Sequence, residues 1–279
     1  MDQSHPARPA KSAARSSAGP ITSRDNPLVK EYARLTADAS FRRESGLFAI
    51  EGARLCADAA ASGTEIRTVL YTARAAALYS AYLEPLFSVC SDCREIAVPL
   101  AGRLSETQAP QGIFCICRRL DNRLPLGKIK RNGRYLLLED VQDPGNLGTI
   151  VRTAEAFGID GLFLTSGCCD LYNPKVLRGS MGGVFRLACA RTEDLPGLLA
   201  CLRESGLSLF ACVADASALP VQQTGLGEGC VCLIGNEGAG LRPETAALCD
   251  KRITIPMQGR AESLNASIAA AIVLWEMAR

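Results

Sequence analysis

The sequence contains very little histidine and few aromatic side chains. A single histidine, His5, occurs among 279 residues, and aromatic residues make up 5% of the chain. Histidine is the usual base that activates serine or cysteine nucleophiles, and it is the commonest metal ligand in proteins. One histidine in an N-terminal tail therefore argues against histidine-based nucleophilic catalysis, and we expect no metal in the folded part.

Long hydrophobic runs are also missing. No apolar run approaches the ~20 residues that a membrane-spanning helix needs, so we expect no membrane partner. The first 20 residues lack the apolar core of a secretory signal and are rich in Ala, Ser, Pro and Arg. We predict a disordered tail over 1–20 and a cytoplasmic protein. An organelle transit peptide is the alternative, which Asp2 and the prolines fit poorly.

Cysteine, in contrast, is plentiful. The chain has 13 cysteines, an odd number scattered through apolar stretches. Without a secretory signal, these are expected to be reduced core residues. Cys90 and Cys93 form one CxxC pair, which lacks the second pair or the histidines of a zinc site.

The charge is small but unevenly distributed. The formal net charge is +2, yet Arg24, Arg42 and Arg43 lie in a basic first half and 121–133 is a basic run. From Tyr135 onward, acidic residues outnumber basic ones. This asymmetry is compatible with nucleic acid contacting the N-terminal part, and solvated surface charge explains it equally well.

The first half alternates strand and helix signals. Strands are predicted at 47–51, 66–71, 95–99 and 113–117, and helices at 28–36, 54–61 and 73–82. The segment 121–133 is polar, basic and contains proline and glycine, so we predict a linker there. The predicted first domain is therefore 21–120.

The second half, 134–279, is predicted to be a parallel α/β domain. Its strand candidates are continuous apolar runs at 135–139, 161–165, 208–214, 230–234 and 252–256. Helix candidates between or after them are 147–157, 195–204 and 266–277. Such strands favour a parallel sheet covered on both faces, which binds ligands at the carboxyl ends of its strands.

The loop after the first of these strands combines a possible helix cap with an unusually placed cation. Asn146 can cap the following helix. Arg152 lies off that helix's apolar stripe, within the first turns, where a cation opposes the helix dipole. An anionic partner such as a phosphate would explain it, and a solvated helix arginine is the alternative.

Two further loops carry unusual chemistry. Gly235–Leu241 holds three glycines in six residues, which permits close backbone approach to a ligand but matches neither G-x-G-x-x-G nor a P-loop. Ser263, Asn265 and Ser267 open the last helix and are more than one cap requires. We expect Leu264, Ile268, Ile272 and Trp275 to form the buried stripe of that helix.

Together these loops resemble the three motifs of the SpoU (TrmH) family of RNA ribose methyltransferases, within the SPOUT superfamily. The matching residues are Asn146-x-Gly148-x-x-x-Arg152, Ile234-Gly235-Asn236-Glu237-Gly238-x-Gly240-Leu241, and Ile255-Pro256-Met257 with Ser263-Leu264-Asn265-x-Ser267. Arg178-Gly179-Ser180-Met181-Gly182 is similar to a further family segment. Residues 24–119 resemble the family's ribosomal-protein-like α/β RNA-binding domain, at Arg42-Arg43-x-x-Gly46-Leu47-Phe48-x-x-Glu51-Gly52 and Pro110-Gln111-Gly112. Asn236 departs from relatives, which often carry a small residue or serine there.

The resemblance implies an α/β trefoil-knot fold that binds S-adenosyl-L-methionine as methyl donor. By position, the donor would be held by Gly235, Ile255, Met257, Ser263 and Leu264. Catalysis would involve Arg152, Asn146, Glu237, Ser263 and Asn265. RNA would contact Arg24, Arg42, Arg43 and Arg178. The family also implies a homodimer through the C-terminal domain.

The sequence thus predicts methyl transfer to a ribose 2′-hydroxyl of RNA, with ribosomal RNA favoured. Transfer RNA, or a base nitrogen, is an alternative target. An RNA-binding ribosome-assembly factor with weak or no catalysis is an alternative of another class. A nicotinamide-dependent oxidoreductase fits the α/β pattern but lacks the fingerprint glycines and a catalytic histidine.

Overall fold

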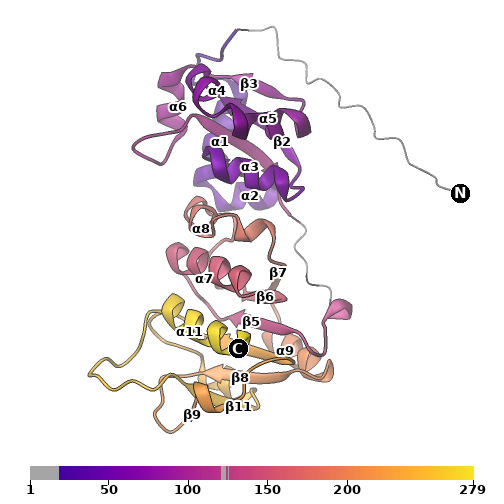
Figure 1. The fold of residues 1–279 in the computed structure, drawn as a ribbon, viewed down its shortest axis with the longest axis vertical. Helices are drawn as coiled ribbons and strands as arrows, with labels where there is room; N and C mark the ends of the chain where they lie inside the picture. The colour runs from indigo at the N-terminus through magenta and orange to yellow at the C-terminus, as the bar shows by residue number, and fades with distance from the viewer. Residues whose placement is uncertain (1–18, 121–123, 125) are drawn as a thin grey trace, which may run out of the picture. The chain divides into compact units, whose positions relative to one another are not determined.

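The structure is a computed structural model that describes residues 19–120, 124 and 126–279. The chain divides into two compact units, one ending at Leu120 and the other beginning at Asp121 (Figure 1). Most of the predicted tail and the start of the predicted linker, 1–18, 121–123 and 125, lie outside the described residues.

The first unit is a four-stranded mixed sheet with helices packed on it. The strand order is β1-β4-β2-β3, with β4 antiparallel to β1 and β2, and β2 parallel to β3. The strands are β1 (Leu47–Glu51), β2 (Ile66–Tyr71), β3 (Cys93–Glu95) and β4 (Ile113–Arg118). The helices are α1 (Pro27–Ala37), α2 (Ala39–Ser45), α3 (Ala53–Ala61), α4 (Ala73–Leu78), α5 (Ser80–Val89) and α6 (Val98–Leu104).

Two predictions in this unit are wrong. The predicted strand over 95–99 stops at Glu95, because Pro99 occupies the first turn of α6, where its fixed φ and missing N–H suit a helix start. The predicted helix over 73–82 is two helices divided at Tyr79. The strands predicted at 47–51 and 66–71 are confirmed.

The second unit is a seven-stranded sheet in which every paired strand is parallel. The order is β7-β6-β5-β10-β8-β11-β9, so the late strand β10 lies between β5 and β8. The strands are β5 (Arg134–Leu138), β6 (Gly161–Thr165), β7 (Cys189–Thr192), β8 (Ser208–Cys212), β9 (Leu219–Pro220), β10 (Cys230–Ile234) and β11 (Lys251–Thr254). The helices are α7 (Pro144–Ala156), α8 (Pro174–Gly179), α9 (Leu195–Glu204), α10 (Pro243–Ala247) and α11 (Ala266–Ala278).

The buried strands carry the core of this unit. All five residues of β6 and of β10 are buried, as their uninterrupted apolar runs predict. α9 packs on one face of the sheet, where Leu198 and Leu202 join a cluster with Leu137, Leu209 and Val231. α11 contacts α7 and β10, and the two helices run beside each other in Figure 1.

The described part of the predicted linker belongs to this unit. Leu124 and Ile129 pack against its core cluster. The backbone N–H of Lys130 donates to the Tyr135 hydroxyl at 2.9 Å, and its ammonium pairs with Asp160 at 2.7 Å. The composition of this segment is mostly polar, which predicts a linker, but its apolar residues Leu124 and Ile129 hold it against the second unit.

The predicted buried stripe of the last helix is wrong. α11 buries Ala270, Val273 and Leu274, whereas Ile268 and Trp275 are 51% and 53% exposed. Because this helix is apolar on all sides, periodicity alone could not choose the buried face. The exposure of two large apolar side chains, Ile268 and Trp275, on this helix calls for an explanation outside the packing of the unit itself.

Candidate functional site

Three segments that follow the carboxyl ends of strands meet at Asn146, which lies in the first turn of α7. Its side-chain Nδ2 donates to Glu237 Oε1 at 3.1 Å, and its Oδ1 accepts from Asn265 Nδ2 at 3.0 Å. The prediction that Asn146 caps this helix is wrong. The cap of α7 is Asp143, which accepts from the backbone N–H of Asn146 at 2.8 Å. Because a separate residue caps the helix, the Asn146 amide is available to link the other two loops.

The Glu237 carboxylate fastens the glycine-rich loop to the first loop. It accepts from the backbone N–H groups of Gln142 at 3.2 Å and Asp143 at 3.0 Å, in addition to Asn146. Burial raises the pKa of Glu237, but hydrogen bonds from Asn146 and from these backbone groups outweigh it and leave that pKa below its usual value. Glu237 is therefore ionised at neutral pH.

Asn265 both caps α11 and reaches the first loop. Its Oδ1 accepts from the backbone N–H of Ser267 at 2.9 Å and of Ile268 at 3.3 Å. Its Nδ2 is left to donate to Asn146. The cap thus fixes the direction in which the amide points.

The glycine-rich loop after β10 closes on itself. Asn236 and Gly240 exchange two backbone hydrogen bonds of 3.0 and 2.9 Å, and Asn236 Oδ1 accepts from the backbone of Gly238 and Ala239. A Cβ on Gly235 would overlap the backbone of Gly240 and Leu241. This close approach, rather than a positive φ, is what requires glycine at 235.

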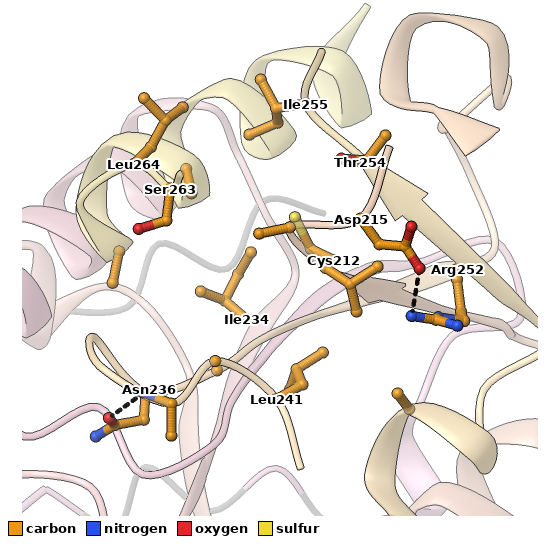
Figure 2. A pocket seen from close by; sticks show the side chains of 18 of the residues that line it. Cys212, Asp215, Ile234, Asn236, Leu241, Arg252, Thr254, Ile255, Ser263 and Leu264 are labelled. Atoms are coloured by element: carbon orange, nitrogen blue, oxygen red, sulfur yellow. Dashed lines mark hydrogen bonds and ion pairs between the residues drawn. The ribbon is translucent and has the colours of Figure 1, made fainter. Parts of the chain in front are cut away.

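A cavity of about 610 Å³ lies between this loop, the end of β8 and the segment after β11 (Figure 2). Apolar walls are provided by Ile234, Leu241, Ile255 and Leu264. The residues expected to hold a donor all line it: Gly235, Ile255, Met257, Ser263 and Leu264. Its size and apolar walls suit a nucleoside-sized ligand.

The cavity also contains an ion pair that the sequence analysis missed. Asp215, just after β8, accepts from Arg252 Nη2 at 2.8 Å, and both residues line the cavity. Their only signal in the sequence is position, since an acid follows the carboxyl end of one parallel strand and a base lies in the next strand of the sheet.

Arg152 lies on α7 and does not line the cavity. Its side chain is exposed, and within the described residues no hydrogen bond or ion pair engages its guanidinium. α7 packs very closely on the segment that follows β6: a Cβ on Gly148 would lie 2.9 Å from the Val176 carbonyl oxygen, and one on Gly183 would lie 3.5 Å from the Arg152 Cα. The segment that includes Arg178 therefore lies against the helix that bears Arg152.

The expectation that Arg42 contacts RNA is wrong. Arg42 is 3% exposed, and its Nη1 donates to the carbonyl oxygens of Leu35 at 2.7 Å and Thr36 at 3.1 Å, where it supports the end of α1. Arg43 and Arg24 are exposed, and Arg43 donates to Ser40 Oγ at 2.9 Å. Adjacent arginines in the sequence thus have different roles in the structure.

Two features of other protein classes are missing from the described residues. Groups of three or more His, Cys, Asp or Glu side chains able to hold a metal ion do not occur in the described part of the chain. Nor does any helix in that part have the length and apolar character needed to cross a bilayer.

Comparison with protein families gives one match for each unit. Residues 133–275 match the SpoU rRNA Methylase family, and residues 26–115 match the MRM3-like substrate binding domain. These ranges cover most of the second and of the first unit.

Whole proteins and solved structures agree with these matches. The chain is 31% identical to the 23S rRNA (guanosine(2553)-2′-O)-methyltransferase RlmP of Bacillus subtilis, over 92% of this chain and 98% of that protein. It is 31% identical to the 23S rRNA (uridine(2479)-2′-O)-methyltransferase of Streptomyces viridochromogenes, over 93% and 91%. The AdoMet-bound rRNA methyltransferase from Sinorhizobium meliloti superposes with a TM-score of 0.81 at 31% identity, over 92% of this chain and 96% of that one. The AdoMet complex of the SpoU methyltransferase AviRb from Streptomyces viridochromogenes gives 0.80 at 28%, over 91% and 97%.

The three motif loops that meet at Asn146, the parallel sheet beneath them and these matches along nearly the whole chain lead to one assignment: the protein belongs to the SpoU rRNA methylase family.

Proposed function

We propose that the protein transfers a methyl group from S-adenosyl-L-methionine to a ribose 2′-hydroxyl of ribosomal RNA. The observation that carries this proposal is the convergence of three loops through Asn146, Glu237 and Asn265 beside an apolar-walled cavity. The relatives that are named as 23S rRNA 2′-O-methyltransferases, and those solved with AdoMet, support the same substrate and donor.

The cavity fits such a donor on its own chemistry. Gly235 lets the backbone of the glycine-rich loop approach a ligand, and Ile255 and Leu264 offer apolar surface for an adenine ring. Met257 and Ser263 complete the set of residues that would hold it. The donor, when bound, supplies a methyl group already activated on a sulfonium.

Arg152 would act on the acceptor. A guanidinium stays protonated in proteins, so it is a poor base for the hydroxyl proton. It can instead bind the phosphate beside the target ribose and lower the pKa of the hydroxyl electrostatically. Asn146, Glu237, Ser263 and Asn265 would position the loops around the reacting groups, and much of the acceleration would come from this positioning.

The first unit would select the RNA, in keeping with its match to a substrate binding domain. Arg24 and Arg43 are exposed there, and Arg178 lies in the second unit near the helix of Arg152. Contacts from these arginines to phosphates would make the affinity for RNA fall as salt rises. Specificity would then come from RNA shape and unstacked bases.

A homodimer through the second unit is part of the proposal. The face of α11 that turns away from its own core presents Ile268 and Trp275. The ring centroids of Trp275 and of Phe157, the residue that ends α7, lie 5.7 Å apart. Large apolar side chains that lie exposed on one face of a helix are typical of protein interfaces. A second copy of the chain would cover them.

Charged substitutions on this face should separate the dimer. Ile268→Asp combined with Trp275→Glu would bury charge in the interface, and a change from two copies to one is expected by light scattering coupled to size exclusion. Leu248→Asp, which places a negative charge on an exposed apolar residue of this unit outside α11, should leave the mass unchanged. A double variant with an unaltered mass would refute this interface.

We also propose that the second unit is knotted and that the protein is cytoplasmic. The insertion of β10 between β5 and β8, followed by a segment that returns to the cavity, is compatible with a trefoil knot in this region. All 13 cysteines are free thiols, which fits a reducing cytoplasm.

Mapping of the modified atom tests the function. Ribosomal RNA from cells with and without the gene should differ by one ribose-methylated nucleotide, detected by mass spectrometry after nuclease digestion. The intact gene should restore it. A difference confined to transfer RNA, or to a base nitrogen, would replace the proposed target, and an unchanged RNA together with no donor binding in calorimetry would favour the assembly factor.

A further inference from the structure

We propose that Asp215 recognises the ribose of the methyl donor by accepting a hydrogen bond from one of its hydroxyls. The inference rests on the proposed function, because it takes the donor to occupy the cavity beside the glycine-rich loop. It assigns a specificity role to a residue that lies outside the three sequence motifs.

Asp215 lies at the side of the cavity away from the residues that are joined to Asn146 (Figure 2). Figure 2 shows Asp215 and Arg252 on one side, with Asn236 and Ser263 on the other and Ile234 between them. The chain continues from Asn236 to Glu237 and from Ser263 to Asn265, so the side of Asn236 and Ser263 is the one joined to the network of Asn146.

This arrangement fixes the direction of the donor. The sulfonium that gives up the methyl group must lie near the acceptor site, at the side of Glu237 and Asn265. The nucleoside part then extends along the apolar walls toward the end of β8. Its ribose carries the only hydroxyl donors of the molecule, and the charged acceptor at that end of the cavity is the Asp215 carboxylate.

The carboxylate has the capacity for one more hydrogen bond. Its Oδ1 accepts from the Ser217 backbone at 2.8 Å and hydroxyl at 2.7 Å, and its Oδ2 accepts from Arg252 at 2.8 Å. A carboxylate has about four acceptor positions, so three of them are used. Hydrogen bonds from Ser217, with a contribution from Arg252, also hold the pKa of Asp215 below its usual value, so the group is a charged acceptor at neutral pH.

Calorimetric titration with S-adenosylhomocysteine and its 2′-deoxy and 3′-deoxy analogues tests the assignment. A hydrogen bond to a charged group corresponds to about 10- to 100-fold in affinity. We expect the natural protein to bind one of the deoxy analogues with an affinity lower by that factor than its affinity for S-adenosylhomocysteine. The affinity of Asp215→Ala for S-adenosylhomocysteine itself should be lower by a similar factor. In this variant, removal of the same hydroxyl from the ligand should then lower the affinity by less than about twofold.

Two controls make the result specific. Glu228→Gln removes a negative charge from an exposed loop before β10, and it should retain the full penalty for the deoxy analogue. Asp215→Asn keeps a neutral acceptor and should give an intermediate penalty. Melting temperatures within a few degrees of the natural protein establish that the variants are folded.

The outcomes separate this inference from the proposed function. If the natural protein does not bind S-adenosylhomocysteine, the proposed function fails. If it binds but the deoxy penalty is absent, or persists undiminished in Asp215→Ala, the ribose assignment is overturned. If Asp215→Ala weakens S-adenosylhomocysteine but not methylthioadenosine, which lacks the amino acid, the ion pair holds the amino-acid end and the assignment is again overturned.

Discussion

Arg152→Ala should lower the single-turnover rate of methyl transfer by about a thousandfold. Arg152 is exposed on α7 and lies outside the cavity, so we expect its guanidinium to act on RNA and not on the donor. In the proposed role, Arg152 stabilises the alkoxide that forms as the ribose hydroxyl reacts. Because this interaction strengthens in the transition state, its loss lowers the rate of the chemical step. The dissociation constant of S-adenosyl-L-methionine, measured by calorimetry, should change less than about twofold.

Two further variants define the role of the charge. Arg152→Lys keeps a cation but loses the planar fork that binds a phosphate through two hydrogen bonds, so an intermediate rate is expected. Arg203→Ala removes an exposed arginine from α9, and its rate should equal that of the natural protein. If Arg152→Ala lost donor affinity by the same factor as rate, Arg152 would have a structural role, and its assignment to the RNA phosphate would be wrong.

Gly235→Ala should abolish donor binding and destabilise the second unit. The added Cβ would overlap the backbone of Gly240 and Leu241, neither of which can move aside as a flexible side chain could. Overpacking of this kind costs about 1–3 kcal/mol, and it would open the loop that Asn236 and Gly240 close. Calorimetric titration should therefore detect at least about a hundredfold loss of donor affinity, since every contact from this loop shifts together.

The same loop contains a matched control. A Cβ on Gly238 would meet only Asn236 Oδ1, at the ordinary van der Waals distance of 3.6 Å. Gly238→Ala should therefore bind the donor within a few fold of the natural protein and melt at a similar temperature. Equal behaviour of the two variants would show that the close approach at 235 does not shape the cavity.

Several elements of the fold could be predicted from the sequence, because local signals there agree with the tertiary environment. β6 and β10 are uninterrupted apolar runs, and their predicted bounds are those of the structure. α11 differs, since all of its faces are apolar and only tertiary contacts decide that Val273 is buried and Trp275 exposed. Arg42 is a similar case, because a buried arginine that caps a helix end cannot be distinguished by composition from the exposed Arg43 beside it.

Those residues of the candidate site that lie in the three sequence motifs could be predicted from the sequence. Asn146, Glu237 and Asn265 belong to three segments that follow parallel strands. Such segments begin at one edge of a sheet, where hydrogen bonds join these residues. The exchange of roles between Asp143 and Asn146 could not be predicted, because both residues favour helix caps. Asp215 and Arg252 belong to no motif, and only the strand order, which sets β8 beside β11, brings them together.

The two-ended use of the Asn146 amide has a consequence for how ligands enter. One end donates to the glycine-rich loop and the other accepts from the start of α11, so these loops are already tied without a ligand. The entropy of ordering them is then lost when the chain folds and not when a ligand arrives. Binding should accordingly resemble entry into a rigid receptor, with little of the heat-capacity change that accompanies coupled folding of a flexible lid.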